Sequence, residues 1–153
     1  MLLPKIKSQQ QKGDRFCTIY ALTNALQIKT GGFISVWRVI ISCFRYKGWP
    51  FLLNRSFNYR EAFAAVHEYG VTVKRPDGSR TQVFPKQLLP VTKDNLDNLL
   101  GSEPILAIQA GNHAVVLTGN LGDWYEVLDS QSEAGYIQRH KEIFISPFYI
   151  IVL

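Results

Sequence analysis

The stretch FCTIYALTNALQI, residues 16–28, decides the fold of this chain. Apolar residues occupy nine of the thirteen positions of this stretch, which leaves few polar ones. A helix that is apolar on nearly all sides is buried in the centre of a protein. We therefore expect a central helix over residues 16–28 that ends at Gly31-Gly32, with Cys17 in its first turn. Asp14 is a candidate N-cap or first-turn acid for this helix.

The composition is typical of one folded domain that spans residues 1–153. Hydrophobic residues make up 46% of the chain, which argues against disorder. The net charge of +5 is spread over scattered basic residues, so we interpret it as surface charge that favours solubility. The two cysteines, Cys17 and Cys43, are too few for a disulfide framework, and a reducing compartment is the simpler expectation.

The first third of the chain predicts neither export nor membrane insertion. Residues 1–11, MLLPKIKSQQQ, lack the apolar region and cleavage site of a signal peptide. The most hydrophobic segment, residues 33–53, is interrupted by Arg38, Arg45 and Lys47, so we expect no membrane-spanning helix. We expect a cytoplasmic protein, or one in the host cytoplasm or virion if its source is viral or phage.

After the central helix, helical patterns come first and strand patterns follow. The helical patterns cover 34–44, where a strand is the alternative, then 59–69, and 93–100 with Thr92 as its cap. The strand patterns cover a hairpin at 71–84, then 104–109, 114–118, 124–128 and 144–153, with a turn at 119–123 and an interruption at Pro147. This order predicts an α+β fold with an antiparallel sheet in its C-terminal half.

Three residues form a candidate catalytic set. Cys17 in the first turn of a helix is exposed to the positive end of the helix dipole, which favours the thiolate. His113 opens one apolar strand and Asp129 follows the next, eight residues before and eight residues after Leu121. If the strands pair about Leu121, the two side chains lie opposite each other at one end of a hairpin. The carboxylate could then orient the imidazole, which could take the thiol proton.

Gln11 is a candidate for the oxyanion hole. It lies six residues before Cys17, so its side-chain amide can fold over the N-terminus of the helix. There it would join the backbone N–H of Cys17 in stabilising an oxyanion. Gln9 and Gln10 compete for this role on composition, and the spacing favours Gln11.

These residues occur in the order Gln, Cys, His and Asp, with Asp129 sixteen residues after His113. This order resembles the papain-like cysteine peptidase superfamily, and most of all the compact C39-type, bacteriocin-processing peptidase domains. The resemblance covers essentially the whole chain. It implies a helical half that carries Cys17, packed on a C-terminal antiparallel sheet that carries His113 and Asp129. It also implies hydrolysis of a protein or peptide substrate through a thioester intermediate, with Gln11 in the oxyanion hole.

The chain departs from the family in two places. Phe16-Cys17-Thr18 stands where C39 domains usually have Asp-Cys-Gly, and residues 12–15 lack the glycine-rich approach of papain-type enzymes. The resemblance therefore does not extend to substrate preference. C39 peptidases cut after a double glycine, but we interpret Gly31-Gly32 of this chain as a helix stop and not as a self-cleavage site.

We assign structural roles to the other candidates. His67 and His140 lack the spacing of metal ligands, and we expect neither a metal nor another cofactor. Cys43 and Trp124 are expected in the core.

Other functions remain open at this point. One is a catalytically silent papain-like adaptor or structural module, and another is an amidase, deamidase, deubiquitinase-like or acyl-transfer enzyme with the same Cys-His-Asp set. No specific nucleic acid is predicted as a partner. The net charge and the apolar–basic segment 34–47 leave room for nucleic-acid binding or contact with a membrane surface. The sequence does not predict an oligomeric state.

Overall fold

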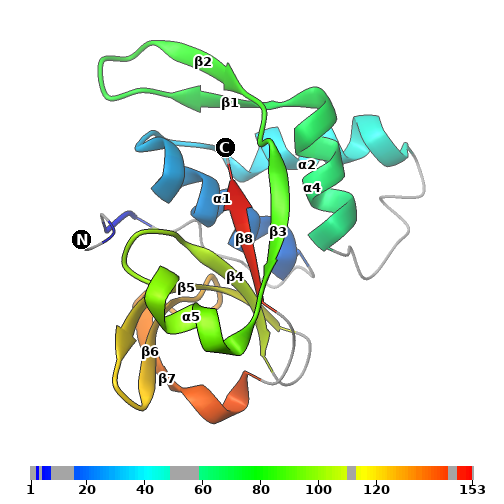
Figure 1. The fold of residues 1–153 in the computed structure, drawn as a ribbon. Coiled ribbons are helices and arrows are strands. Elements are labelled where there is room, and N and C mark those ends of the chain that lie inside the picture. The colour runs from blue at the N-terminus through cyan, green and yellow to red at the C-terminus, as the bar shows by residue number, and fades with distance from the viewer. Residues whose placement is uncertain are drawn as a thin grey trace.

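A computed structural model describes residues 3, 5–7, 16–48, 59–109, 113–144 and 148–152 of the chain (Figure 1). In chain order the elements are α1 (Cys17–Thr30), α2 (Val36–Lys47), α4 (Tyr59–Tyr69), β1 (Val71–Lys74), β2 (Arg80–Val83), β3 (Gln87–Val91), α5 (Lys93–Leu99), β4 (Ile105–Gln109), β5 (His113–Leu121), β6 (Trp124–Leu128), β7 (Tyr136–His140), the short 3₁₀ helix η1 (Lys141–Ile143) and β8 (Phe148–Val152). Helices lead and antiparallel strands follow, so the predicted α+β class is confirmed.

The strands form a two-stranded hairpin, β1–β2, and a six-stranded antiparallel sheet in the order β3-β8-β4-β5-β6-β7. Strand β8 lies in the interior of this sheet, where it pairs with β3 on one side and β4 on the other. In Figure 1 the helices α1, α2 and α4 lie at one end of the molecule with the β1–β2 hairpin, and strands β4 to β7 lie at the other end with α5.

Helix α1 is the centre of the larger core. Every residue from Ile19 to Ile28 is buried, as the apolar pattern predicted. The helix packs on β5, with α2 and α4 beside it. Strand β5 is buried on both faces, because Ala114 and Val116 pack in the core with α1 while Val115 and Leu117 pack in a second core on the other face. The start of α1 and the start of β5 are therefore held close together by packing.

Two glycines end α1. Gly31 has a φ of +68°, and its N–H donates to a carbonyl one turn earlier at 3.0 Å, which is a left-handed C-cap. A Cβ at Gly32 would lie 2.4 Å from Cγ1 of Val73, because β1 passes close to this position. Phe33 and Lys74 exchange both backbone hydrogen bonds at 2.8 Å, which ties the end of α1 to the hairpin. The interpretation of Gly31-Gly32 as a helix stop is confirmed.

Strands β3 and β7 were not predicted from the sequence. Strand β3 contains Pro90, which normally argues against a strand. It is tolerated because β3 is an edge strand that pairs on one side only, with β8. Strand β7 is the other edge and pairs along its full length with β6. Both strands carry weak patterns of their own and form through pairing with β8 and β6.

Thr92 holds the N-cap position of α5 as predicted, and its side chain makes no capping hydrogen bond. Two local expectations are wrong. Strand β5 continues to Leu121, so the turn occupies Gly122-Asp123 and not all of 119–123. Trp124 is 45% exposed, because it begins β6 at the hairpin tip, where its ring meets His140 edge-on at 5.2 Å.

Candidate active site

Cys17 is the first residue of α1, and the side chain of the N-cap residue makes no capping hydrogen bond. Phe16 and not Asp14 holds the N-cap position, and Asp14 itself lies outside the described residues. The first helical hydrogen bond runs from the N–H of Tyr20 to the carbonyl of Phe16 at 2.9 Å, and the earlier N–H groups are directed out of the helix end. The half-buried thiol of Cys17 therefore lies at the positive end of the helix dipole, which favours a thiolate.

His113 and Asp129 belong to the β5–β6 hairpin, His113 as the first residue of β5 and Asp129 directly after β6. The hairpin turns at Gly122-Asp123 and not about Leu121 as predicted. One step beyond the last observed pair sets Asp129 opposite Val115, two residues from His113. The expectation that His113 and Asp129 lie directly opposite each other is therefore wrong, and they are diagonal neighbours.

A β-bulge in β5 sets the residue that Asp129 lies opposite. The pairing with β6 shifts by one residue between Leu117 and Gly119. With an unbroken register Asp129 would lie opposite Val116. The extra residue in β5 shifts the register by one, so that Asp129 lies opposite Val115, two residues from His113.

The side chains of His113 and Asp129 are joined by a short hydrogen bond. The Nε2–H of His113 donates to Oδ1 of Asp129 at 2.7 Å, and the two side chains are only 12% and 6% exposed. The same carboxylate oxygen accepts the backbone N–H of Gln131 at 2.9 Å, and the backbone N–H of Asp129 donates to the carbonyl of Gly135 at 2.9 Å. These bonds fix the carboxylate, and they leave Nδ1 of His113 to face the thiol.

The pKa values of Cys17 and His113 move in opposite directions. Burial raises the pKa of the Cys17 thiol, but hydrogen bonds with His113 and with the backbone of Ala114 more than offset burial and hold the pKa below 9.0. Burial lowers the pKa of His113, whereas hydrogen bonds with Asp129 and Cys17 raise it to about 9. Each partner therefore stabilises the charged form of the other.

The carboxylate of Asp129 remains ionised over the same pH range. Burial raises its pKa, but hydrogen bonds from His113 and from the N–H of Gln131 lower the pKa below 3.8. The positive charge of Arg139 acts in the same direction. The ring of His113 therefore lies between an ionised carboxylate and a thiol whose pKa is lowered.

Gln11 lies outside the described residues, so its role at the oxyanion hole stays a prediction. The chain ahead of it is held on the sheet. Nζ of Lys5 lies 2.7 Å from Oε2 of Glu126 and 4.5 Å from the ring centroid of Tyr136. The N–H of Ile6 donates to the hydroxyl of Tyr136 at 3.0 Å. Sequence reasoning missed this role of Tyr136, because it depends on β7, which was not predicted.

The remaining candidates contribute to packing or lie on the surface. Cys43 is fully buried, and burial together with the charge of Glu61 raises its pKa to about 12. His67 is exposed and its Nδ1 lies 2.5 Å from the carbonyl of Pro85, while His140 flanks the hairpin tip. In the part of the chain that the structure describes, no group of three or more His, Cys, Asp or Glu side chains could hold a metal ion. None of the helices in that part has the length and apolar character needed to cross a membrane.

Solved structures of two peptidase domains are similar to this chain. One is a double glycine motif protease from an AMS/PCAT transporter, in complex with the leader peptide, with a TM-score of 0.65 and 17% identity over 98% of this chain and 93% of that one. The other is the peptidase domain of Streptococcus ComA, a bifunctional ABC transporter involved in a quorum-sensing pathway, with a TM-score of 0.64 and 14% identity over 97% of this chain and all of that one. No protein-family model and no curated protein sequence matches the chain. The expected fold, that of the C39-type peptidase domains, is confirmed.

Proposed function

We propose that this chain is a papain-like cysteine peptidase in which Cys17 is the nucleophile, His113 the general base and Asp129 the residue that orients the histidine. The observation that carries the proposal is the contact series Cys17–His113–Asp129, which brings three elements together out of water. A thiolate paired with an imidazolium attacks a carbonyl carbon without an additional base. The fold shared with two peptidase domains supports the same reading.

Acylation begins when the Cys17 thiolate attacks the carbonyl carbon of a peptide bond. A C–S bond forms, and the π electrons of the carbonyl move to its oxygen. The backbone N–H of Cys17 and the side-chain amide of Gln11 donate to this oxyanion, and one such donor lowers the barrier by about 3 kcal/mol. Nδ1–H of His113 then protonates the leaving nitrogen, the C–N bond breaks, and the amine leaves a thioester on Cys17.

Deacylation uses the same residues in the reverse direction. Nδ1 of the neutral His113 takes a proton from a water molecule as the water oxygen attacks the thioester carbon. The intermediate collapses, the C–S bond breaks, and the carboxylic acid product leaves the thiolate and imidazolium restored. The Nε2–H of His113 stays bonded to Asp129 throughout, so the carboxylate stabilises the imidazolium and keeps the ring in position.

The proposed substrate is a peptide. One structural relative is described as a double glycine motif protease and was solved with its leader peptide, so double-glycine peptides are the first substrates to test. Thr18 follows Cys17 in this chain, and it changes the surface beside the nucleophile relative to a glycine. An amidase or an acyl-transfer enzyme would share the first step and differ in the leaving group or in the acceptor of the acyl group.

Selective alkylation tests the ion pair. At pH 6 an ordinary thiol is almost entirely protonated, so iodoacetamide should modify Cys17 and leave Cys43 unmodified in a peptide map by mass spectrometry. The rate should fall about tenfold or more in His113→Ala, because the imidazolium no longer stabilises the thiolate. It should be unchanged in Cys43→Ala and His140→Ala, the matched controls. Equal rates for His113→Ala and the wild type would overturn the proposed pair.

Turnover tests the reaction class. A peptide library that includes double-glycine sequences is incubated with the wild type and with Cys17→Ala, and the products are identified by mass spectrometry. Cleavage that disappears in Cys17→Ala supports a peptidase. Release of ammonia, or transfer of the acyl group to an added amine, assigns an amidase or acyl-transfer enzyme instead. A reactive Cys17 with no turnover of any substrate would favour the silent adaptor.

A further inference from the structure

An apolar group of side chains lies on the surface where α1 gives way to α2. Trp37 is 67% exposed, Phe33 53% and Ile41 45%. Trp37 and Ile41 are four residues apart on α2 and so lie on one side of the helix, and Phe33 lies just before it, tied to the hairpin by its hydrogen bonds with Lys74. Single exposed apolar residues are ordinary, but three large exposed ones within nine residues of the chain, a tryptophan among them, point to an interaction surface.

Basic side chains surround this apolar group. Arg38 and Arg45 are exposed on α2, and Lys74 and Arg80 are exposed on the neighbouring hairpin. Arg38, Lys74 and Arg80 line a shallow hollow of about 120 Å³ together with Phe33. Two separate elements therefore place three cations around one apolar ring. We call Phe33, Trp37, Ile41 and these four basic residues the α2 face.

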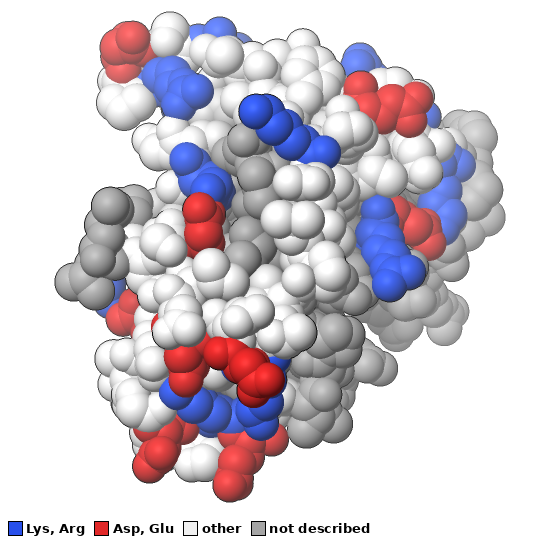
Figure 2. All heavy atoms as spheres, in the orientation of Figure 1, with Lys and Arg blue, Asp and Glu red and all other residues white. Residues whose placement is uncertain are grey.

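Acidic side chains are missing from the sequence around the α2 face. No Asp or Glu occurs from residue 15 to residue 60. Lys47 is paired with Glu61 of α4 and is not counted in the face. Among the described residues, no carboxylate forms an ion pair with Arg38, Arg45, Lys74 or Arg80. Figure 2 shows basic and acidic side chains at both ends of the molecule, including the end that carries the hairpin.

We propose that the α2 face docks on the surface of an anionic phospholipid bilayer. Indole rings favour the headgroup region, where Trp37 would lie with Phe33 and Ile41 in contact with the acyl boundary. The four cations meet the negative headgroups, and each one near such a surface strengthens binding by about fivefold. The apolar side of α2 is buried in the core through Val36, Val39 and Cys43, so Trp37 and Ile41 would contact the bilayer from the exposed side of the helix.

The apolar part of the face favours a bilayer over a nucleic acid. Phosphates of DNA or RNA would engage the cations, but Ile41 would gain little from a phosphate backbone. In a bilayer interface the aliphatic side chain and the aromatic rings are buried together, and the cations remain at the headgroups. Of these two partners, only a bilayer would contact both the cations and the apolar side chains of the α2 face.

The α2 face lies away from the proposed catalytic residues. Cys17 begins α1 and Thr30 ends it, a length of about 20 Å. Phe33 follows the far end of that helix, so docking of this surface leaves the thiol open to substrate. The inference does not depend on the proposed peptidase activity, and binding and catalysis can be tested separately.

Vesicle binding tests the proposal. The full chain is sedimented with phosphatidylcholine vesicles and with vesicles that contain about 30% phosphatidylglycerol, at low and high salt. We expect partitioning to the anionic vesicles at least tenfold above that to the neutral ones, weakened by salt. Trp37→Ala should lower partitioning about tenfold, and Arg38→Gln/Arg80→Gln about 25-fold, from two cations at fivefold each.

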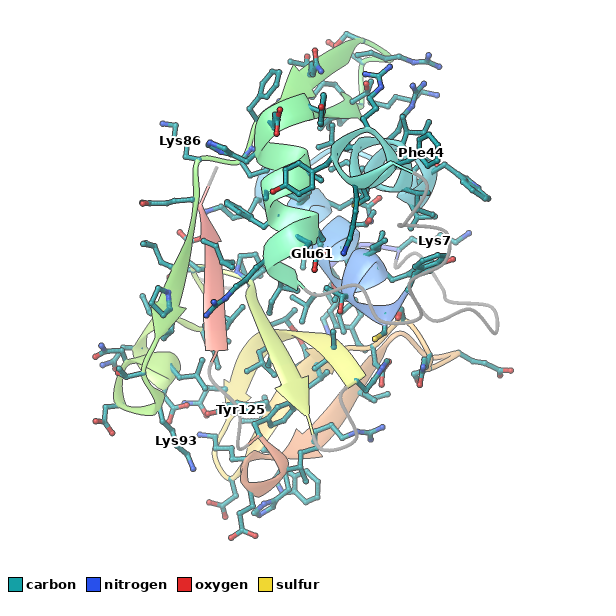
Figure 3. The ribbon with its side chains drawn as sticks, turned by 90° about the vertical axis from the view of Figure 1, so that its right-hand side faces the viewer. Lys7, Phe44, Glu61, Lys86, Lys93 and Tyr125 are labelled. Atoms are coloured by element: carbon teal, nitrogen blue, oxygen red, sulfur yellow. The ribbon has the colours of Figure 1, made fainter. Side chains whose placement is uncertain are left out.

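Matched controls come from other surfaces. Trp124→Ala removes an exposed tryptophan at the hairpin tip, and Lys86→Gln/Lys93→Gln removes two cations that Figure 3 places on the β3 and α5 side, away from Phe44 of α2. Both controls should bind as the wild type does, and equal thermal midpoints would show that all variants are folded. Absence of partitioning, equal losses in the controls, or tighter binding to duplex DNA or to an acidic peptide at the same salt would each overturn the proposal.

Discussion

Replacing Asp129 with asparagine removes a charge from the candidate site and keeps a hydrogen-bond acceptor. The amide oxygen can still accept the Nε2–H of His113, so the ring keeps its orientation. The charge that stabilises the imidazolium is lost. We therefore expect Asp129→Asn to change the pKa of His113 and the pH range in which Cys17 reacts, with a smaller effect on the maximum rate.

The size of the effect follows from the pKa of His113, which is about 9. That value lies about 2.5 pH units above that of an ordinary histidine. Asp129 and Cys17 together supply the rise, each by a hydrogen bond and by its charge, against the opposing effect of burial. With about half of the rise assigned to the carboxylate, its removal lowers the pKa of His113 by at least about one pH unit, and one unit is a tenfold change in the proton-binding equilibrium.

The assay has two parts. Titration of the His113 ring nitrogens by NMR gives the pKa directly, and the rate of Cys17 alkylation as a function of pH gives the range in which the thiolate is paired with an imidazolium. We expect the pKa to fall to about 8 or below and the alkaline limit of that range to fall by about one pH unit with it, with a larger change in Asp129→Ala, which also lacks the acceptor. Asp123→Asn, at the exposed hairpin turn, is the control and should change neither quantity. A pKa of His113 that stays near 9 in Asp129→Asn would refute the reasoning.

Three further predictions concern stability. Gly32→Ala should reduce the free energy of unfolding by roughly 2 kcal/mol in urea, because a Cβ there would lie 2.4 Å from the nearest side-chain atom of β1, whereas Gly119→Ala meets its nearest side-chain atom at 3.4 Å and should cost less. Tyr136→Phe removes the hydroxyl that accepts the N–H of Ile6, so it should cost about 1 kcal/mol, and an unchanged unfolding midpoint would contradict this role. Because the folded-state pKa of Asp129 lies below 3.8, this carboxylate contributes stability above that pH and loses its contribution as the pH falls through the folded-state value. The acid loss of stability should therefore be shallower in Asp129→Asn than in the wild type, and parallel curves would show that the group is not involved.

Hydrophobic periodicity predicted a helix or strand correctly where a glycine or a turn next to it in the sequence marks its end. Helix α4 and strand β6 begin and end as predicted, because a glycine follows α4 and a turn precedes β6. Strands β3 and β7 carry weak patterns of their own and exist as edges of the sheet through pairing with β8 and β6. Pairing of this kind depends on tertiary structure, so local sequence did not predict it.

The reason for placing Cys17 in the candidate site was correct, whereas the reason for placing His113 beside Asp129 was not. The position of Cys17 at a helix start follows from the apolar run behind it. The proximity of His113 and Asp129 was expected from a count about Leu121, but the hairpin turns elsewhere and a bulge corrects the register. A bulge has no clear sequence signal here, and the backbone N–H groups of Ala114 and Gln131 that tune the pKa values are placed by the fold and not by a motif.

Cys17, His113 and Asp129 are unevenly spaced along the chain, and this spacing affects the order in which they come together during folding. His113 and Asp129 are 16 residues apart within one hairpin, whereas Cys17 lies 96 positions before His113. Short loops close faster than long ones, so the imidazole and the carboxylate meet before α1 docks on β5. Until that docking, the thiol keeps the pKa of an ordinary cysteine. The proposed nucleophile, Cys17, therefore gains the hydrogen bond that lowers its pKa only as the core closes around it.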